Sequence, residues 1–216
     1  MLNEKINKIL QNPIADKIFG LPAILISSYT IFEYFKLLNF KNFDIHYSLI
    51  VLNSCVVILT VLTRRTASRI SFHWFHVLIS WIRIYWSYAL VHFSAIYPTQ
   101  TVFYQQFISF LLILSLTIIF FSRINLGRNI GILPAQRQLV FKGPYSYVRH
   151  PIHTGMILFF ISFLLKNYST FNLFMVSSGI IFFILKSFIE EKFLKQDVSY
   201  LEYCNQVKWK WIPGLI

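Results

Sequence analysis

The residues best able to do chemistry lie together in one short stretch, Gly143 to Gly155, with the sequence GPYSYVRHPIHTG. Pro151 suits the first position of a helix, because a proline there loses no hydrogen bond, and His150 would then be the cap residue. The free N–H groups and the positive dipole end of such a helix, with Arg149 and His150 beside them, attract an anion. The pattern predicts either an anion site at this turn or a basic loop end that touches lipid phosphates.

A second charged cluster closes the last long apolar stretch and consists of Lys186, Glu190 and Glu191. Lys186 and Glu190 are four residues apart and therefore face the same way on a helix. Ionisable groups at the margin of a membrane span are costly and often functional, although a helix that leaves the bilayer also gains charges. The residues alone leave both interpretations open.

Two histidine pairs have a spacing of three residues, which puts both rings on one helix face. His150 and His153 could hold a metal, but no carboxylate or cysteine lies near them in the sequence, so we expect no metal site. His73 and His76 lie beside Trp74 at the start of an apolar stretch, and we interpret them as histidines at a membrane interface.

Two further charges lie inside apolar stretches. Arg83 is in the middle of one of these stretches, and Glu33 is in the outer half of another. An isolated charge in a membrane is expensive, so each needs a partner or a water-filled cavity, and the two could pair with each other. We expect a structural role for both.

The elements that must position these residues are membrane helices. Hydrophobic residues make up 56% of the chain and charged residues only 13%, whereas soluble domains have about 25% charged residues. A spanning helix needs about 20 mainly apolar residues. The candidate stretches are about 18–38, 46–63, 74–95, 103–122, 154–165 and 171–189. The fifth is short, so we expect it to be tilted or half-buried and paired with the sixth. The sequence therefore predicts an all-α, multi-pass bundle of about six spans, with an N-terminal four-helix region, 1–122, and a C-terminal region, 123–216, that carries both charged clusters.

Lysine and arginine are distributed unevenly among the predicted loops. They concentrate in the N-terminal arm, the loop after the second helix, the long loop from Arg123 to His153 and the tail, whereas the opposite loops hold little beyond Lys41 and Lys166. The positive-inside rule predicts that both termini and the long loop face the cytoplasm. Topology thus explains the net charge of +12, and we expect no nucleic-acid partner. The predicted location is the cytoplasmic membrane in a bacterium or the endoplasmic reticulum in a eukaryote.

At the two charged clusters the sequence resembles the isoprenylcysteine carboxyl methyltransferase family, which is related to the phospholipid methyltransferases. The resemblance covers roughly Leu126 to Pro213, somewhat under half of the chain, and its first part runs from Leu126 to Gly155 through the core G-P-Y-x-x-V-R-H-P. It resumes at Glu190-Glu191, Tyr200-Leu201-Glu202-Tyr203, Val207 and Ile212-Pro213. The resemblance implies a pocket for S-adenosylmethionine, enclosed by the last two membrane helices, the loop before them and the tail.

Carried over by position, the resemblance also implies the residues of the site. Those that would bind the cofactor are Arg137, Gln138, Leu139, Val140, Tyr145, His150, Pro151, Ile152, His153 and Glu190, and those predicted to be catalytic are Lys186, Arg149 and Glu191. The family usually has tyrosine where His153 stands, and an arginine that faces the acceptor where Lys186 stands. Lysine keeps the charge but loses the bidentate fork that matches a carboxylate.

The implied reaction is methyl transfer to a lipid-like or lipidated acceptor, either an isoprenylcysteine-type carboxylate or, as an alternative, a phospholipid amine. A carboxylate is already nucleophilic, whereas an amine must first lose a proton, and Glu191 or His153 is then the candidate base. A second alternative is an NADPH-dependent enzyme similar to the sterol reductases, which usually follow an R-H-P segment with Asn-Tyr where this chain has Ile152 and His153. A third is a non-catalytic membrane or transport protein, which charges inside the spans at Arg83 and Glu33 would suit.

Overall fold

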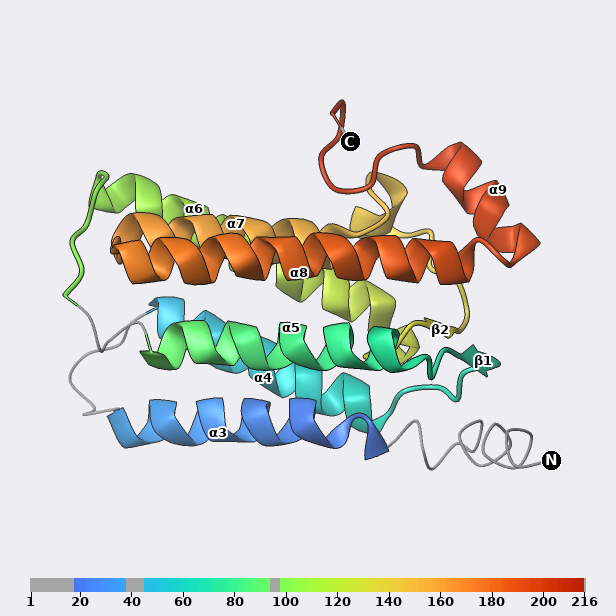
Figure 1. The fold of residues 1–216 in the computed structure, drawn as a ribbon, viewed down its shortest axis with the longest axis horizontal. Helices are drawn as coiled ribbons and strands as arrows, with labels where there is room; N and C mark the ends of the chain where they lie inside the picture. The colour runs from blue at the N-terminus through green and yellow to red at the C-terminus, as the bar shows by residue number, and fades with distance from the viewer. Residues whose placement is uncertain (1–17, 38–44, 94–97, 216) are drawn as a thin grey trace.

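The computed structural model describes residues 18–37, 45–93 and 98–215. Within them the long helices are α3 (Leu21–Leu37), α4 (Ile45–Leu62), α5 (Trp74–Phe93), α6 (Gln105–Leu126), α7 (Pro151–Lys166) and α8 (Thr170–Leu194), and a shorter α9 (Val198–Gln206) follows in the tail. The remaining elements are the short 3-10 helices Gly127–Asn129 and Gly143–Ser146 and the two-residue strands β1 (Arg69–Ile70) and β2 (Ala135–Gln136). The long helices run roughly side by side along the length of the molecule (Figure 1).

Every predicted apolar stretch forms a helix, but several boundaries differ from the prediction. Helix α8 continues to Leu194, so Lys186, Glu190 and Glu191 lie inside a helix and not at its end. Helix α7 begins at Pro151 with His150 as its cap residue, which confirms the predicted start of this helix. The predicted helix ends at residues 38 and 95, and the N-terminal arm, lie outside the described residues.

Two helical segments, Gln105–Asn129 and Thr170–Leu194, are long and apolar enough to cross a membrane. The apolar stretches within α3, α4 and α7 are shorter. The chain is therefore a mostly helical protein with two candidate membrane-spanning helices among the described residues. The full set of six spans stays a prediction, as do the cytoplasmic position of the termini and the identity of the membrane.

The helices pack mainly as pairs, α6 along α7, α3 along α4 and α5 along α8, while α4 also contacts α6 and α7 contacts α8. A buried apolar core joins α5, α7 and α8, and its members are Leu90, Phe160, Met175, Val176 and Phe183. Helices α6 and α7 approach closely at Gly155. A Cβ atom there would lie 2.6 Å from Cγ1 of Ile119 and 3.0 Å from the carbonyl oxygen of Ser115. The packing of α7 on α6 thus depends on the missing side chain.

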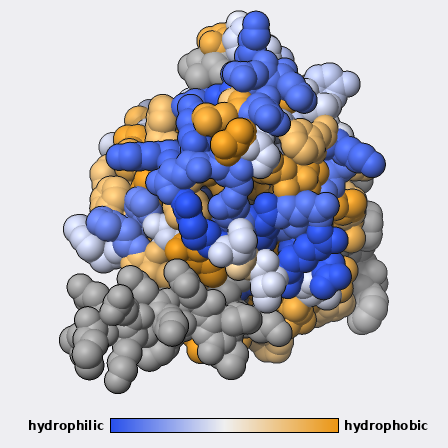
Figure 2. All heavy atoms as spheres, turned by 90° about the vertical axis from the view of Figure 1, so that its right-hand side faces the viewer, coloured by the Kyte–Doolittle hydropathy of each residue, from blue (hydrophilic) through white to orange (hydrophobic). Residues whose placement is uncertain are grey.

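The loop before α5, the loop before α7 and the tail after α8 gather at one end of the bundle (Figure 1). Hydrophilic residues cover this end, and hydrophobic residues surround it on the flanks (Figure 2). Strand β1 pairs antiparallel with β2, the Arg65 N–H donates to the Arg128 carbonyl at 2.7 Å, and Arg128 Nε donates to the Thr63 carbonyl at 2.6 Å. Hydrogen bonds therefore link the predicted regions 1–122 and 123–216 to each other at the polar end.

Candidate functional site

A cavity of about 310 Å³ lies between the helices of the bundle, at the small end of the range of about 300–1,000 Å³ that is usual for ligand pockets. Its walls come from α3, α4, α5, α6, α7, α8, the long loop and α9. The predicted site residues that line it are Arg137, Gln138, Leu139, Val140, Tyr145, Arg149, His150, Ile152, His153 and Glu190. Pro151, Lys186 and Glu191 do not line the cavity.

The first turn of α7 opens onto this cavity. The Thr154 N–H is the first to bond within the helix, donating to the His150 carbonyl at 3.1 Å, so the N–H groups of Ile152 and His153 have no intrahelical partner. The rings of His150 and His153 lie 5.2 Å apart, as their spacing predicts. Both histidines are buried, and neither Nε2 atom forms a hydrogen bond. Unpaired buried polar atoms are uncommon in proteins, and the Nε2 atom of His153 is one of them at this cavity.

Glu190 approaches this turn from α8. Ligand atoms of His150, His153 and Glu190 all lie within 4.8 Å of one another, an arrangement that can also hold a metal ion. The Lys186 Nζ atom is 3.0 Å from Glu190 Oε1, as the four-residue spacing predicts, and Lys186 is fully buried. The basic turn and the acidic part of α8, which are distant in the sequence, therefore lie together.

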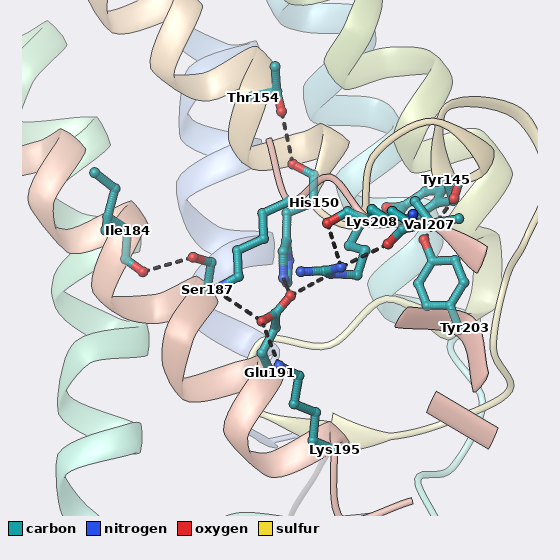
Figure 3. Close-up of polar contacts among 12 residues, drawn as sticks. Tyr145, His150, Thr154, Ile184, Ser187, Glu191, Lys195, Tyr203, Val207 and Lys208 are labelled. Atoms are coloured by element: carbon teal, nitrogen blue, oxygen red, sulfur yellow. Dashed lines mark hydrogen bonds and ion pairs between the residues drawn. The ribbon is translucent and has the colours of Figure 1, made fainter. Parts of the chain in front are cut away.

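Glu191, next to Glu190, contacts basic groups of the turn before α7, of the end of α8 and of the tail. Its Oε1 atom accepts a hydrogen bond from Arg149 Nε at 2.7 Å and lies 3.6 Å from His150 Nε2. Its Oε2 atom lies 3.5 Å from Lys195 Nζ and 3.1 Å from Lys210 Nζ. Figure 3 shows the carboxylate between His150 and Lys195. Glu191 is only 3% exposed, so its carboxylate is enclosed by protein, whereas the side chain of Lys195 is 44% exposed.

Arg149 is committed to the tail as well as to Glu191. Its Nη1 atom donates to the carbonyls of Val207 at 2.8 Å and Lys208 at 2.9 Å, and its backbone N–H donates to the Trp209 carbonyl at 2.9 Å. These contacts fasten the tail against the start of α7. The geometry gives Arg149 and Glu191 a positioning role, and a catalytic role for either residue stays a prediction.

Buried tyrosines complete the polar end of the cavity. The Tyr203 hydroxyl donates to the Tyr145 carbonyl at 2.7 Å, and the rings of Tyr200 and Tyr203 are 5.7 Å apart. All of these tyrosines line the cavity. Burial raises the pKa of Tyr145, Tyr200 and Tyr203 above the ordinary value of about 10. Their hydroxyls therefore stay protonated near neutral pH and can donate hydrogen bonds.

Arg123 was not predicted as a site residue, and for Arg83 the predicted cavity is present but the suggested partner Glu33 is not. Both arginines line the cavity. The suggested pair of Arg83 with Glu33 does not form, because Glu33 pairs with Lys36 at 3.7 Å, while the Arg83 guanidinium lies 5.2 Å from the centre of the Phe183 ring. The position of Arg83 in the middle of an apolar stretch was a usable signal, since it asks for a cavity. Arg123 follows an apolar stretch and gave no such signal.

The comparison with known proteins concerns this same part of the chain. Residues 104–197 match the phospholipid methyltransferase family. The match confirms the resemblance seen in the sequence and supports a membrane methyltransferase of the phospholipid and isoprenylcysteine methyltransferase kind. A search of curated proteins finds no match. The phospholipid methyltransferase segment contains Arg123, His153 and Glu190, whereas Arg83 and the other cavity residues of α3, α4 and α5 precede it.

Proposed function

We propose that this protein is a methyltransferase that uses S-adenosylmethionine and methylates a lipid-like or lipidated acceptor. The observation that supports this most strongly is that His150, His153 and Glu190 border one cavity within the segment matched to the family. S-adenosylmethionine supplies a methyl group that is already activated on a sulfonium, so the protein has to bind and orient. Two candidate membrane-spanning helices beside the cavity suit an acceptor with a lipid tail.

The residues of the cavity fit such a cofactor. The Glu190 carboxylate suits its ammonium group or a ribose hydroxyl, and Arg137 with the first turn of α7 suits its carboxylate. The face of Tyr145 suits the sulfonium or the adenine. The Nε2 atom of His153 is buried without a hydrogen bond, and a bound ligand could satisfy it.

The helix α9 forms the wall of the cavity nearest the tail. Tyr200 and Tyr203 of this helix are buried and pack with Val207 against Leu139 of the long loop and Leu194 of α8. Polar interactions are stronger where water is excluded, because the local dielectric constant is lower. We propose that α9 and the long loop exclude water from the reacting groups.

The nature of the acceptor decides which side chains must act. A carboxylate needs only alignment, whereas an amine needs a base. His153 lines the cavity and its Nε2 atom has no hydrogen-bond partner, so we propose that this atom accepts the proton of an amine. Glu191, the other candidate base, is held by Arg149 and does not line the cavity. The match to phospholipid methyltransferases favours a phospholipid amine as the second candidate acceptor beside an isoprenylcysteine-type carboxylate.

Calorimetry with purified protein tests the cofactor. Substitution Glu190→Gln should weaken S-adenosylmethionine binding by about tenfold or more, because a neutral amide cannot form the charge-assisted contact that the carboxylate makes with the cofactor. Glu202→Gln removes an exposed carboxylate from α9 and should leave the affinity unchanged. Unchanged affinity in Glu190→Gln would contradict the proposed cofactor position. An ultraviolet spectrum of bound NADPH in the purified protein would favour the sterol-reductase alternative.

Transfer of a labelled methyl group into membrane extracts tests the reaction. Label in base-stable phospholipid headgroups would identify an amine acceptor, and base-labile label in a lipidated carboxylate would identify an ester. The absence of both transfer and S-adenosylmethionine binding would favour the non-catalytic alternative.

A further inference from the structure

The cavity carries more positive charge than the cofactor requires. Among the described residues that line it, the arginines are Arg83, Arg123, Arg137 and Arg149, and the acid is Glu190. The Glu190 carboxylate already has the buried Lys186 ammonium at 3.0 Å. The lining is therefore strongly cationic, and a cofactor with two positive groups and one negative group would not neutralise it.

Two of the arginines are already held by protein groups. Arg149 pairs with Glu191 and donates to carbonyls of the tail. Arg137 Nε donates to the Arg65 carbonyl at 3.0 Å. These contacts anchor the guanidinium groups of Arg137 and Arg149 at the polar end of the bundle, so the surplus charge lies elsewhere.

Arg83 and Arg123 carry that surplus. Within the described part of the chain the Nε atoms of Arg83 and Arg123 are both buried and have no hydrogen-bond partner. The Arg83 guanidinium lies against the Phe183 ring, and both arginines line the same cavity. Unpaired charges inside a membrane are costly and usually mark a binding site or an ion pathway.

We infer that Arg83 and Arg123 form a subsite for the anionic group of the acceptor, a carboxylate or a phosphate on an amphiphile. The inference rests on the proposed function and deepens it. Guanidinium groups bind both kinds of anion through paired N–H donors, and they do so most strongly away from water. Lys186, which the resemblance assigns to the acceptor, is fully buried and does not line the cavity. The two arginines replace it as the cations available to an acceptor.

The apolar part of the acceptor has a place beside this subsite. Side chains of α3 and α4 line the same cavity, and these are Ala23, Ile26, Val57 and Val61. A hydrocarbon chain can lie against them while its anionic group binds the arginines and its reacting atom points toward His153 and Glu190. A neutral amphiphile would fill the apolar part but leave both charges unpaired, so the acceptor must be anionic at this point.

Binding measurements in a neutral detergent test the subsite without methyl transfer. The probes are oleoyl lysophosphatidate, oleate, neutral monoolein and inorganic phosphate, each titrated by calorimetry against the purified protein. We expect lysophosphatidate and oleate to bind about tenfold or more tightly than monoolein, because only they supply a charge-assisted partner. Inorganic phosphate should bind more weakly than lysophosphatidate, because it lacks the apolar chain.

Variants assign the binding to the two arginines. Arg83→Met and Arg123→Met should each weaken lysophosphatidate binding about tenfold or more while S-adenosylmethionine affinity stays within about threefold. Arg83→Lys and Arg123→Lys keep the positive charge but lose the paired N–H donors, so these variants should bind lysophosphatidate with intermediate affinity. They provide the test if a methionine variant misfolds. Lys142→Met removes an exposed cation outside the cavity and should change neither affinity.

The outcomes separate this inference from the proposed function. If the arginine variants lose S-adenosylmethionine binding and keep lysophosphatidate, the arginines hold the cofactor carboxylate and the inference is wrong. Equal binding of monoolein and lysophosphatidate, or of inorganic phosphate and lysophosphatidate, would also overturn it. Binding of lysophosphatidate through the arginines, with no S-adenosylmethionine binding by the unmodified protein, would instead leave the subsite standing and remove the proposed function.

Discussion

Arg149 and Glu191 are 42 residues apart in the sequence, yet Arg149 Nε donates a hydrogen bond to Glu191 Oε1 at 2.7 Å. Their side chains are only 8% and 4% exposed. Because Arg149 also binds the carbonyls of Val207 and Lys208, this pair connects the turn before α7, the helix α8 and the tail. The polar end of the cavity thus depends on one buried ion pair.

Breaking this pair should destabilise the protein strongly. Glu191→Gln leaves Arg149 and Lys210 without their carboxylate, and removing one partner of a buried ion pair costs about 3–5 kcal/mol. Thermal and denaturant unfolding in detergent would measure the loss, and limited proteolysis would show a loosened tail. Glu202→Gln, which removes an exposed carboxylate from the same end of the molecule, should leave the unfolding midpoint unchanged. An equal midpoint for the two variants would argue against the positioning role of Glu191.

A side chain at Gly155 should disturb the packing of α7 on α6. In Gly155→Ala the new methyl group would meet Ile119 and the Ser115 carbonyl at 2.6 and 3.0 Å, and overpacking of this kind costs about 1–3 kcal/mol. The measurement is the free energy of unfolding, with Ser177→Ala at an exposed position of α8 as the control. A Gly155→Ala protein as stable as that control would show that the two helices can move apart without cost.

The substitution His153→Tyr should be tolerated by the fold and by cofactor binding. Tyrosine is the usual residue of the resembling family here, and the extra volume can extend into the cavity that His153 lines. We expect S-adenosylmethionine affinity within about threefold of the unmodified protein. If the acceptor is an amine, methyl transfer should fall sharply because tyrosine cannot take the proton near neutral pH, whereas transfer to a carboxylate should persist. Loss of cofactor binding would assign His153 a contact that tyrosine cannot reproduce.

The stability should depend on pH through the buried tyrosines. Burial raises the pKa of Tyr145, Tyr200 and Tyr203 in the folded state, so folding disfavours their ionised forms. The contribution of these tyrosines to the free energy of unfolding is fully present below the pKa of about 10 that tyrosine has in the unfolded chain. It is lost as the pH rises toward their higher pKa values in the folded state. The unfolding midpoint should therefore be insensitive to these groups near neutral pH and fall in alkaline solution.

Tyr203→Phe provides the check on this pH dependence. It removes one ionisable group, so the alkaline fall should become shallower. It also removes the hydrogen bond to the Tyr145 carbonyl, which should cost about 1 kcal/mol near neutral pH. An alkaline profile identical to that of the unmodified protein would mean that Tyr203 does not ionise in this range in either state.

The positions of the helices could be predicted from the sequence because apolar stretches and their flanking charges are local properties. Pro151 marked the start of α7 for the same reason, since its ring suits the first helical position. The end of α8 could not be predicted as well, because Lys186, Glu190 and Glu191 looked like charges beyond a span. The helix continues through them, and their charges are satisfied by Arg149, Lys195 and Lys210 from other parts of the fold.

The candidate site was predictable where a motif marked it and obscure elsewhere. The segment from Arg137 to Val140 and the turn at His150 could be carried over from the family, and they line the cavity. The different surroundings of the adjacent residues Glu190 and Glu191 could not be predicted, because they depend on the direction in which each side chain leaves α8. Arg123 was missed because its role depends on which helices pack together, and no local pattern encodes that.

The cavity takes its walls both from the segment that matches the family and from helices that precede this segment. The segment 104–197 carries the family match, whereas α3, α4 and α5 contribute Arg83 and apolar side chains from outside it. Mutation in the earlier helices can therefore retune which amphiphile fits without touching the side chains proposed for the methyl donor. A chimera with α3–α5 grafted from a relative of different preference would inherit that preference, provided that the β1–β2 pairing survives at the joint.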